Sequence, residues 1–145
     1  MLPNDYQPEH YESLLERKVA RYLPSFEALG APPPSLYRSP TVAFRMRAEF
    51  RVWHEGDDLN FVMFDREKPK EPVIIETFPF ASLSIQKLLP VVRDALKNDA
   101  ELRHKLFQIE FLSTLSGDVL VTLIYHRKLD DEWAQAAKAL SSKLT

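Results

Sequence analysis

One run of alternating residues constrains the fold of this chain more than any other segment. From Phe44 to Trp53, every second residue is apolar, and arginine, glutamate and tryptophan alternate with these apolar residues. Side chains of a β-strand point alternately to the two faces of a sheet, so this spacing predicts a strand with one core face and one polar face. The predicted core face carries Phe44, Met46, Ala48, Phe50 and Val52, and the polar face carries Arg45, Arg47, Glu49, Arg51 and Trp53.

The polar face of this strand has side-chain types that suit nucleic-acid binding. A guanidinium binds phosphate with a planar fork of donors, and an indole ring offers a flat surface on which a base can stack. The same alternation is also typical of a solvated strand face on which arginine pairs with Glu49. Both interpretations stay open on the pattern alone.

Composition narrows the class of protein. A chain of 145 residues with 45% apolar content predicts one compact domain with a core. The net charge of -2 argues against a nonspecific coat on nucleic acid, but it leaves room for a local basic face. Cysteine is absent, which excludes disulfides, thiolate metal sites, iron–sulfur clusters and thiol nucleophiles. Residues 1–5 do not resemble a signal peptide and no apolar stretch approaches membrane-spanning length, so we expect a soluble cytoplasmic protein.

The periodicity predicts an α+β fold with a mostly antiparallel sheet, in the order αβββαββα. Apolar residues at helical spacing end near Pro24, where a helix should stop or kink, and an extended tether follows from Gly30 to Pro40. Pro90 indicates a kink or an early boundary within a later helix. The expected strands are 44–54, Leu59–Asp65, Val73–Phe78, Leu106–Leu115 and Val119–His126, and the expected helix caps are Ser84, Asp99 and either Asp130 or Asp131.

The strand at Val119–His126 is apolar on both faces, which is typical of a strand in the middle of a sheet. Pairing it with the preceding strand would bring two basic clusters together, Arg103-His104-Lys105 and His126-Arg127-Lys128. With Phe107 beside them, these clusters could clamp an RNA loop and stack its unpaired bases. The alternative places Phe107 in the core and leaves the charges to solvate the strand ends.

No catalytic constellation is evident. The four histidines lack metal-ligand spacing, and three glycines are too few for a phosphate-binding loop. The carboxylate pairs Asp57-Asp58 and Asp130-Asp131 fit turns and helix caps better than acid–base catalysis.

Four segments, in this order, resemble the bacterial tRNA uracil-C5 methyltransferases, which convert uracil-54 of the T-loop to ribothymidine. They are Tyr37-Arg38-Ser39-Pro40, the run from Phe44 through Asp58 to Leu59 (FRMRAEFRVWHEGDDL), Arg103 to Ile109 (RHKLFQI) and Tyr125 to Trp133 (YHRKLDDEW). The resemblance extends from about Tyr11 to Thr145. The related ribosomal-RNA branch has N-terminal cysteines for an iron–sulfur cluster and an added β-barrel, and this chain has neither.

The resemblance implies a definite chemistry for the family. A cysteine thiolate adds to C6 of the uracil, C5 takes the methyl group of S-adenosylmethionine, and a carboxylate removes the C5 proton. In the family these groups and the domain that binds S-adenosylmethionine lie beyond the segment that this chain matches. We therefore expect residues 1–145 to be a single N-terminal RNA-recognition domain with no catalytic residue. By itself it should be inactive, and it should bind no S-adenosylmethionine, metal or iron–sulfur cluster.

The expected partner is the tRNA T-arm, and the expected state is a cytoplasmic monomer. In this interpretation arginines hold phosphates and aromatic rings stack on bases. The RNA-binding residues are predicted to be Arg45, Arg47, Arg51, Trp53, Phe107, His126 and Arg127. One alternative is a protein-interaction module whose basic face docks an acidic partner or the missing catalytic domain. Another is a small hydrolase, which would require a constellation that the sequence does not contain.

Overall fold

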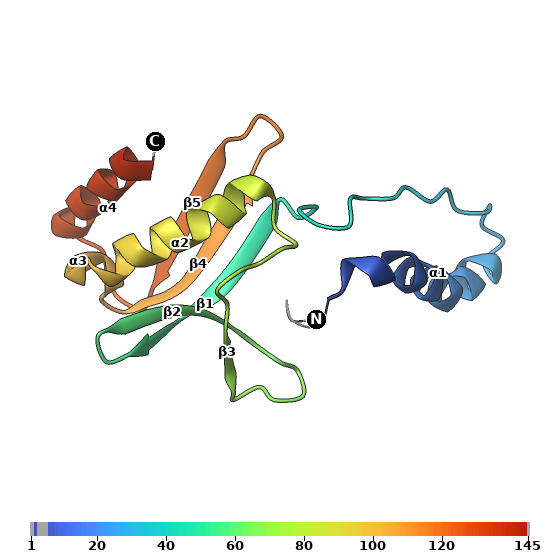
Figure 1. Ribbon diagram of the computed structural model, residues 1–145, viewed down its shortest axis with the longest axis horizontal. Coiled ribbons are helices and arrows are strands. Elements are labelled where there is room, and N and C mark those ends of the chain that lie inside the picture. The colour runs from blue at the N-terminus through green and yellow to red at the C-terminus, as the bar shows by residue number, and fades with distance from the viewer. Residues whose placement is uncertain (1, 3–5, 145) are drawn as a thin grey trace.

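The computed structural model describes Leu2 and residues 6–144, so the expectation about residues 1–5 lies almost wholly outside the described residues. It shows one antiparallel sheet of five strands, in the order β3-β2-β1-β4-β5, with helices on one face (Figure 1). The α+β class and the predicted order of elements are confirmed. The strands are β1 (Arg47–Glu55), β2 (Asp58–Phe64), β3 (Pro72–Ile74), β4 (Leu106–Ser113) and β5 (Val119–Tyr125), and the helices are α1 (Tyr11–Glu27), α2 (Leu83–Lys97), α3 (Ala100–Arg103) and α4 (Asp131–Leu144).

Buried and exposed side chains alternate along β1 as the sequence predicted. Ala48, Phe50 and Val52 are buried in the core, while the residues between them are exposed. The strand begins at Arg47 and not at Phe44, because the backbone of Arg45 forms its hydrogen bonds with residues outside the strands. Arg45 donates its N–H to the carbonyl of Phe80 and accepts the N–H of Ser82, which holds this residue outside the sheet ladder.

Helix α2 covers the centre of the sheet and presents a continuous apolar stripe to it. The N-cap is Ser82, whose hydroxyl accepts the N–H of Ile85, so the predicted cap at Ser84 is wrong by two residues. Pro90 lies inside the helix without ending it. The buried residues of the helix are Ile85, Leu89, Val92 and Leu96. Asp99 caps α3 and Asp130 caps α4, each by accepting a backbone N–H three residues along.

Helix α1 stands apart from the sheet and has no buried residue (Figure 1). It runs through Pro24 to Glu27, so of the two alternatives that the sequence left open, a stop or a kink, the helix does not stop at the proline. The helix contacts the extended tether that follows it, where Arg38 pairs with Glu12 at 2.9 Å and the Tyr11 hydroxyl accepts the N–H of Ser39. Tyr6 then anchors this arm to the body through ring contacts with Phe80 and Phe44.

Two predictions about the edges of the sheet are wrong. The strand expected over Val73–Phe78 is shorter and covers only Pro72–Ile74. The strand expected in the middle of the sheet, now β5, lies at its edge and pairs with β4 alone. In the part of the chain that the structure describes, no helix is long and apolar enough to cross a membrane.

Candidate nucleic-acid interface

A β-bulge at the start of β4 determines where Phe107 points. Leu106 lies opposite Tyr125 and Gln108 lies opposite Ile124, so Phe107 is the extra residue in its strand. Leu106 and Ile109 are both buried although they are three residues apart. The two residues between them therefore both point away from the core, since the bulge interrupts the alternation. Lys105, just before the bulge, takes a left-handed backbone conformation with φ of 55°, which is uncommon outside glycine.

Three side chains form a column on the outer face of the sheet, the face opposite α2. The guanidinium carbon of Arg51 lies 3.8 Å from the centre of the Phe107 ring. On the same ring stacks the imidazole of His126, with the two ring centres 3.9 Å apart and the planes 25° apart. The column joins β1, β4 and the end of β5, and His126 at its end is exposed. The alternative that Phe107 belongs to the core with Ile109 and Phe111 does not hold in this structure.

The two basic clusters meet at the open end of the β4–β5 hairpin, as the sequence predicted. His126 donates its backbone N–H to the carbonyl of Lys105, and Arg127 donates to the carbonyl of His104. Two arginines of these clusters, Arg127 and Arg103, already bind other groups of the protein. Arg127, with a side chain only 12% exposed, pairs with Glu101 and also donates to that residue's carbonyl.

Arg103 is the second of these internally hydrogen-bonded arginines. Its guanidinium donates to four backbone carbonyls, of which two belong to the turn between β1 and β2, one to the first residue of β2 and one to Lys97 at the end of α2. This residue therefore fixes the turn to the end of α2. Of the two clusters, His104, Lys105, His126 and Lys128 are the exposed members.

The outer face of β1 carries the remaining predicted residues. Arg47 pairs with Glu49 at 3.2 Å and with Glu110 of β4 at 3.4 Å, so part of its charge is balanced by neighbours. Trp53 is 39% exposed, and its ring meets Phe64 edge to face. Arg45 is exposed but precedes the strand and stands apart from the column.

Sequence reasoning missed two features of this surface. Glu110 faces outward from β4 beside Arg47, and Gln108 donates to it at 3.0 Å, so the face is less basic than β1 alone indicates. The bulge was also missed. No residue type near Phe107 indicates a bulge, because the residue with the left-handed backbone conformation is Lys105 and not a glycine.

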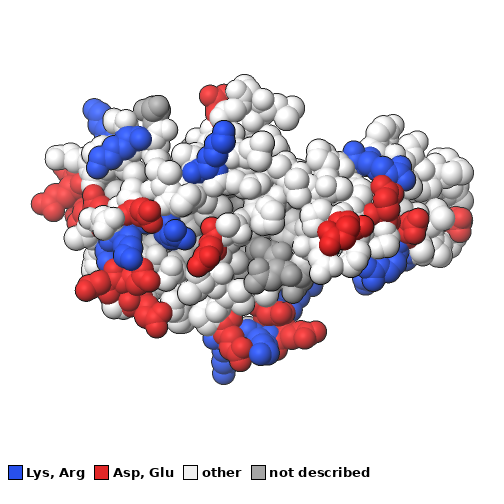
Figure 2. All heavy atoms as spheres, in the orientation of Figure 1, with Lys and Arg blue, Asp and Glu red and all other residues white. Residues whose placement is uncertain are grey.

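The helical face of the sheet carries charged side chains of both signs (Figure 2). Figure 2 shows the face that carries α2, where acidic and basic side chains are interspersed. A site for a polyanion needs basic side chains gathered on one surface. The exposed cations near the column therefore favour the outer face over the helical one.

Asp58, one of the two carboxylates of the Asp57-Asp58 pair, is hydrogen-bonded to neighbouring side chains. A hydrogen bond from Lys97 holds the pKa of Asp58 below its usual range, and Asn60 donates to the same carboxylate. A carboxyl with a lowered pKa is a poor proton donor at neutral pH. Among residues 2 and 6–144, no three or more histidine or acidic side chains gather in a group that could hold a metal ion.

Comparison with known proteins decides the family. The family model described as tRNA (Uracil-5-)-methyltransferase matches residues 10–145. The chain belongs to this family. It is 49% identical over 139 residues to a tRNA/tmRNA (uracil-C(5))-methyltransferase of Dechloromonas aromatica, covering 96% of this chain and 38% of that protein. The proteins of the same name from Vibrio atlanticus and Edwardsiella ictaluri are 49% and 48% identical, covering 97% and 99% of this chain.

This member of the tRNA (uracil-5-)-methyltransferase family thus spans 38–39% of the length of these relatives. The match runs through all the strands and helices of the sheet domain, including the column and both basic clusters. The resemblance found in the sequence is confirmed at the level of the family.

Truncating two phenylalanines of β4 distinguishes the two faces of the sheet. Phe111 is fully buried, so Phe111→Ala should lower the free energy of unfolding by about 3–5 kcal/mol. Phe107→Ala removes only the contacts of the column and should cost about 1 kcal/mol. Urea denaturation of both variants measures the difference. Equal losses would place Phe107 in the core.

Arg127 should matter for stability more than an exposed arginine does. Arg127→Ala leaves Glu101 unpaired and two carbonyls without a donor, and we expect a loss of about 2–4 kcal/mol. The matched control is Arg45→Ala, whose exposed side chain should contribute within about 0.5 kcal/mol. Thermal melts followed by circular dichroism compare them, and a small loss for Arg127→Ala would contradict the structural role.

Proposed function

We propose that this chain is the N-terminal, tRNA-recognising part of a tRNA uracil-C5 methyltransferase, and that the outer face of β1, β4 and β5 binds the T-arm. Family membership supports the choice of a tRNA substrate, since the relatives are named for uracil-C5 methylation of tRNA. The surface itself supports the choice of this face, because it combines exposed cations with exposed aromatic rings.

The column of Arg51, Phe107 and His126 is the observation that carries the proposal. Single-stranded loops are recognised by stacking their unpaired bases on aromatic side chains and on guanidinium planes. The column already has the spacing of a base stack, since its two ring centres are 3.9 Å apart. A base that leaves its own stack can continue the column on His126.

The arginines of this surface, Arg51 of the column included, are proposed to bind the phosphates of the RNA backbone. Arg45 is exposed, and Arg47 is held only by exposed or half-exposed carboxylates, a pairing that is weak in water and can yield to phosphate. Trp53 offers a further stacking surface two residues along β1 from Arg51. We propose that Arg127 acts as a positioning residue, because its hydrogen bonds fix the strand end that presents His126.

Methyl transfer is assigned to the part of the relatives that this chain does not span. The proposed reaction needs a thiolate, and the chain has no cysteine. S-adenosylmethionine supplies the methyl group. The described residues include no glycine-rich loop that could bind this cofactor. The three glycines lie at the end of α1 and in two hairpin turns rather than in a loop between a strand and a helix. The proposed contribution of this chain is to bind and orient the RNA.

Binding of a T-arm stem-loop tests this proposal. Arg51→Ala should weaken binding and reduce the salt dependence by about one phosphate contact. Phe107→Ala and His126→Ala should each cost about 1–3 kcal/mol of binding free energy, the usual value of a lost base–aromatic stack. Fluorescence anisotropy at several salt concentrations measures both quantities.

The matched control for these variants is Lys87→Ala, which removes an exposed cation of α2 on the opposite face. It should leave affinity and salt slope nearly unchanged. If the three column variants bind as tightly as the unaltered chain, the outer face is not the RNA site. Equal effects from Lys87→Ala would indicate nonspecific charge attraction.

A further inference from the structure

The free edge of β5 lacks the short length, the charges and the proline that commonly protect an edge strand. The strand is seven residues long, Val119 to Tyr125, and contains no charged residue, no proline and no glycine. Its outer side chains include Leu120, which is 61% exposed. On the side away from β4, alternate backbone groups have no partner strand in the described sheet. A long apolar edge of this kind is a template for pairing with another strand.

The other edge of the same sheet is protected. β3 has only three residues and begins with Pro72. The turn before it carries Lys68, Lys70 and Glu71, which are exposed charges. Short length, proline and nearby charge are the usual devices against pairing at an edge. The sheet therefore has one edge that resists a further strand and one that would accept it.

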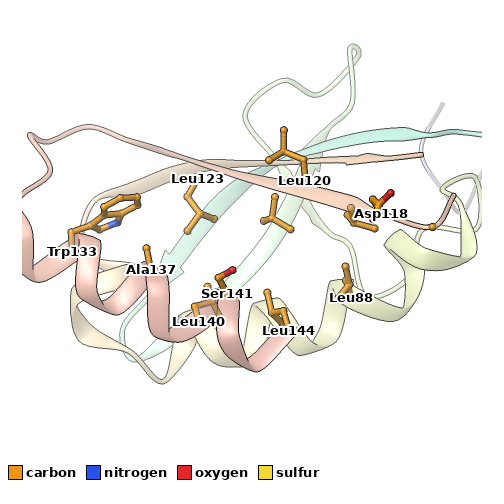
Figure 3. Close-up of a pocket in the computed structure, with 12 residues that line it drawn as sticks. Leu88, Asp118, Leu120, Leu123, Trp133, Ala137, Leu140, Ser141 and Leu144 are labelled. Carbon is orange, nitrogen blue, oxygen red and sulfur yellow. The ribbon is translucent and has the colours of Figure 1, made fainter. Parts of the chain in front are cut away.

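An apolar groove lies against the inner face of β5. Figure 3 shows this groove between the strand, α4 and the beginning of α2, and its volume is about 510 Å³. Leu123 of β5 and Leu88 of α2 line it, together with Leu140 and Leu144 of α4. Helix α4 packs on the same side of the sheet as α2 and lies toward the β5 side of the molecule (Figure 1).

The direction of α4 specifies how a further strand would enter. Leu144, at the end of this helix, lines the same groove as Asp118 and Val119, where β5 begins. Polypeptide that continues from α4 is therefore delivered to the beginning of β5 and would run parallel to it. A strand, a helix and a parallel strand form the common crossover unit, which is right-handed in nearly all proteins. The β4 side of β5 is occupied, so only the free edge remains.

We propose that the free edge of β5 is completed by a parallel strand from the polypeptide that follows α4 in the full-length relatives, and that the side chains of this strand fill the groove beneath α4. The relatives extend far beyond the matched region, so they have the chain needed to supply it. The apolar character of β5 on both faces is then explained, because it becomes an interior strand. The outer-face column lies on other residues and stays uncovered by this pairing.

Hydrogen exchange of the β5 amides tests the proposal without any RNA, so its failure would leave the RNA-binding proposal standing. The segment that follows the matched region in the Dechloromonas aromatica relative is joined after Thr145. Alternate β5 amides should exchange at least ~10-fold more slowly in this hybrid than in the 145-residue chain, because they gain partners. The β3 amides at the protected edge serve as the internal control and should not change.

The intact Dechloromonas aromatica relative provides a second measurement if the hybrid does not fold. Protection factors over its segment equivalent to Val119–Tyr125 should match those of an interior strand. Fast exchange of alternate amides in either protein overturns the proposal. A 145-residue chain that is dimeric by light scattering, with β5 already protected, would instead assign the edge to a second copy and would also overturn it.

Discussion

The packing of Phe50 fixes which face of the central strand is inside. Its ring stacks on Phe61 of β2 at 6.0 Å and meets Phe78 edge to face at 5.1 Å. A shift of β1 by one residue would turn these contacts out into water and bring the arginines into the core. The same contact therefore presents Arg47, Arg51 and Trp53 on the outer face. The packing of the core thus determines which side chains the candidate site contains.

The sequence predicted most of this arrangement because the relevant signal is local. Alternation in β1 needs only neighbouring residues, and it identified both the core row and the polar row. The cap residues Asp99 and Asp130 also act over three residues. The cap of α2 was misplaced because Ser82 and Ser84 are chemically equal. Tertiary contacts distinguish them, since the Ser82 hydroxyl also hydrogen-bonds that of Ser113.

The column could not be derived from periodicity. Regular alternation through Ile109 and Phe111 would place Phe107 in the core, and the bulge reverses its direction. The position of β5 was also misjudged, but for an instructive reason. Its composition is that of an interior strand, and the described sheet leaves it at the edge. That mismatch between sequence and position is the basis for proposing an additional strand there.

The sheet in this account divides its surfaces between two tasks. We propose that the inner face and the β5 edge bind polypeptide and that the outer face binds RNA. Amide chemical-shift mapping with a T-arm stem-loop tests this division most directly. We predict that the shifted resonances come from the outer-face residues of β1 and from the open end of the β4–β5 hairpin, around Arg51, Phe107 and His126. Shifts confined to α2 and α4, or no shifts at all, would contradict the account.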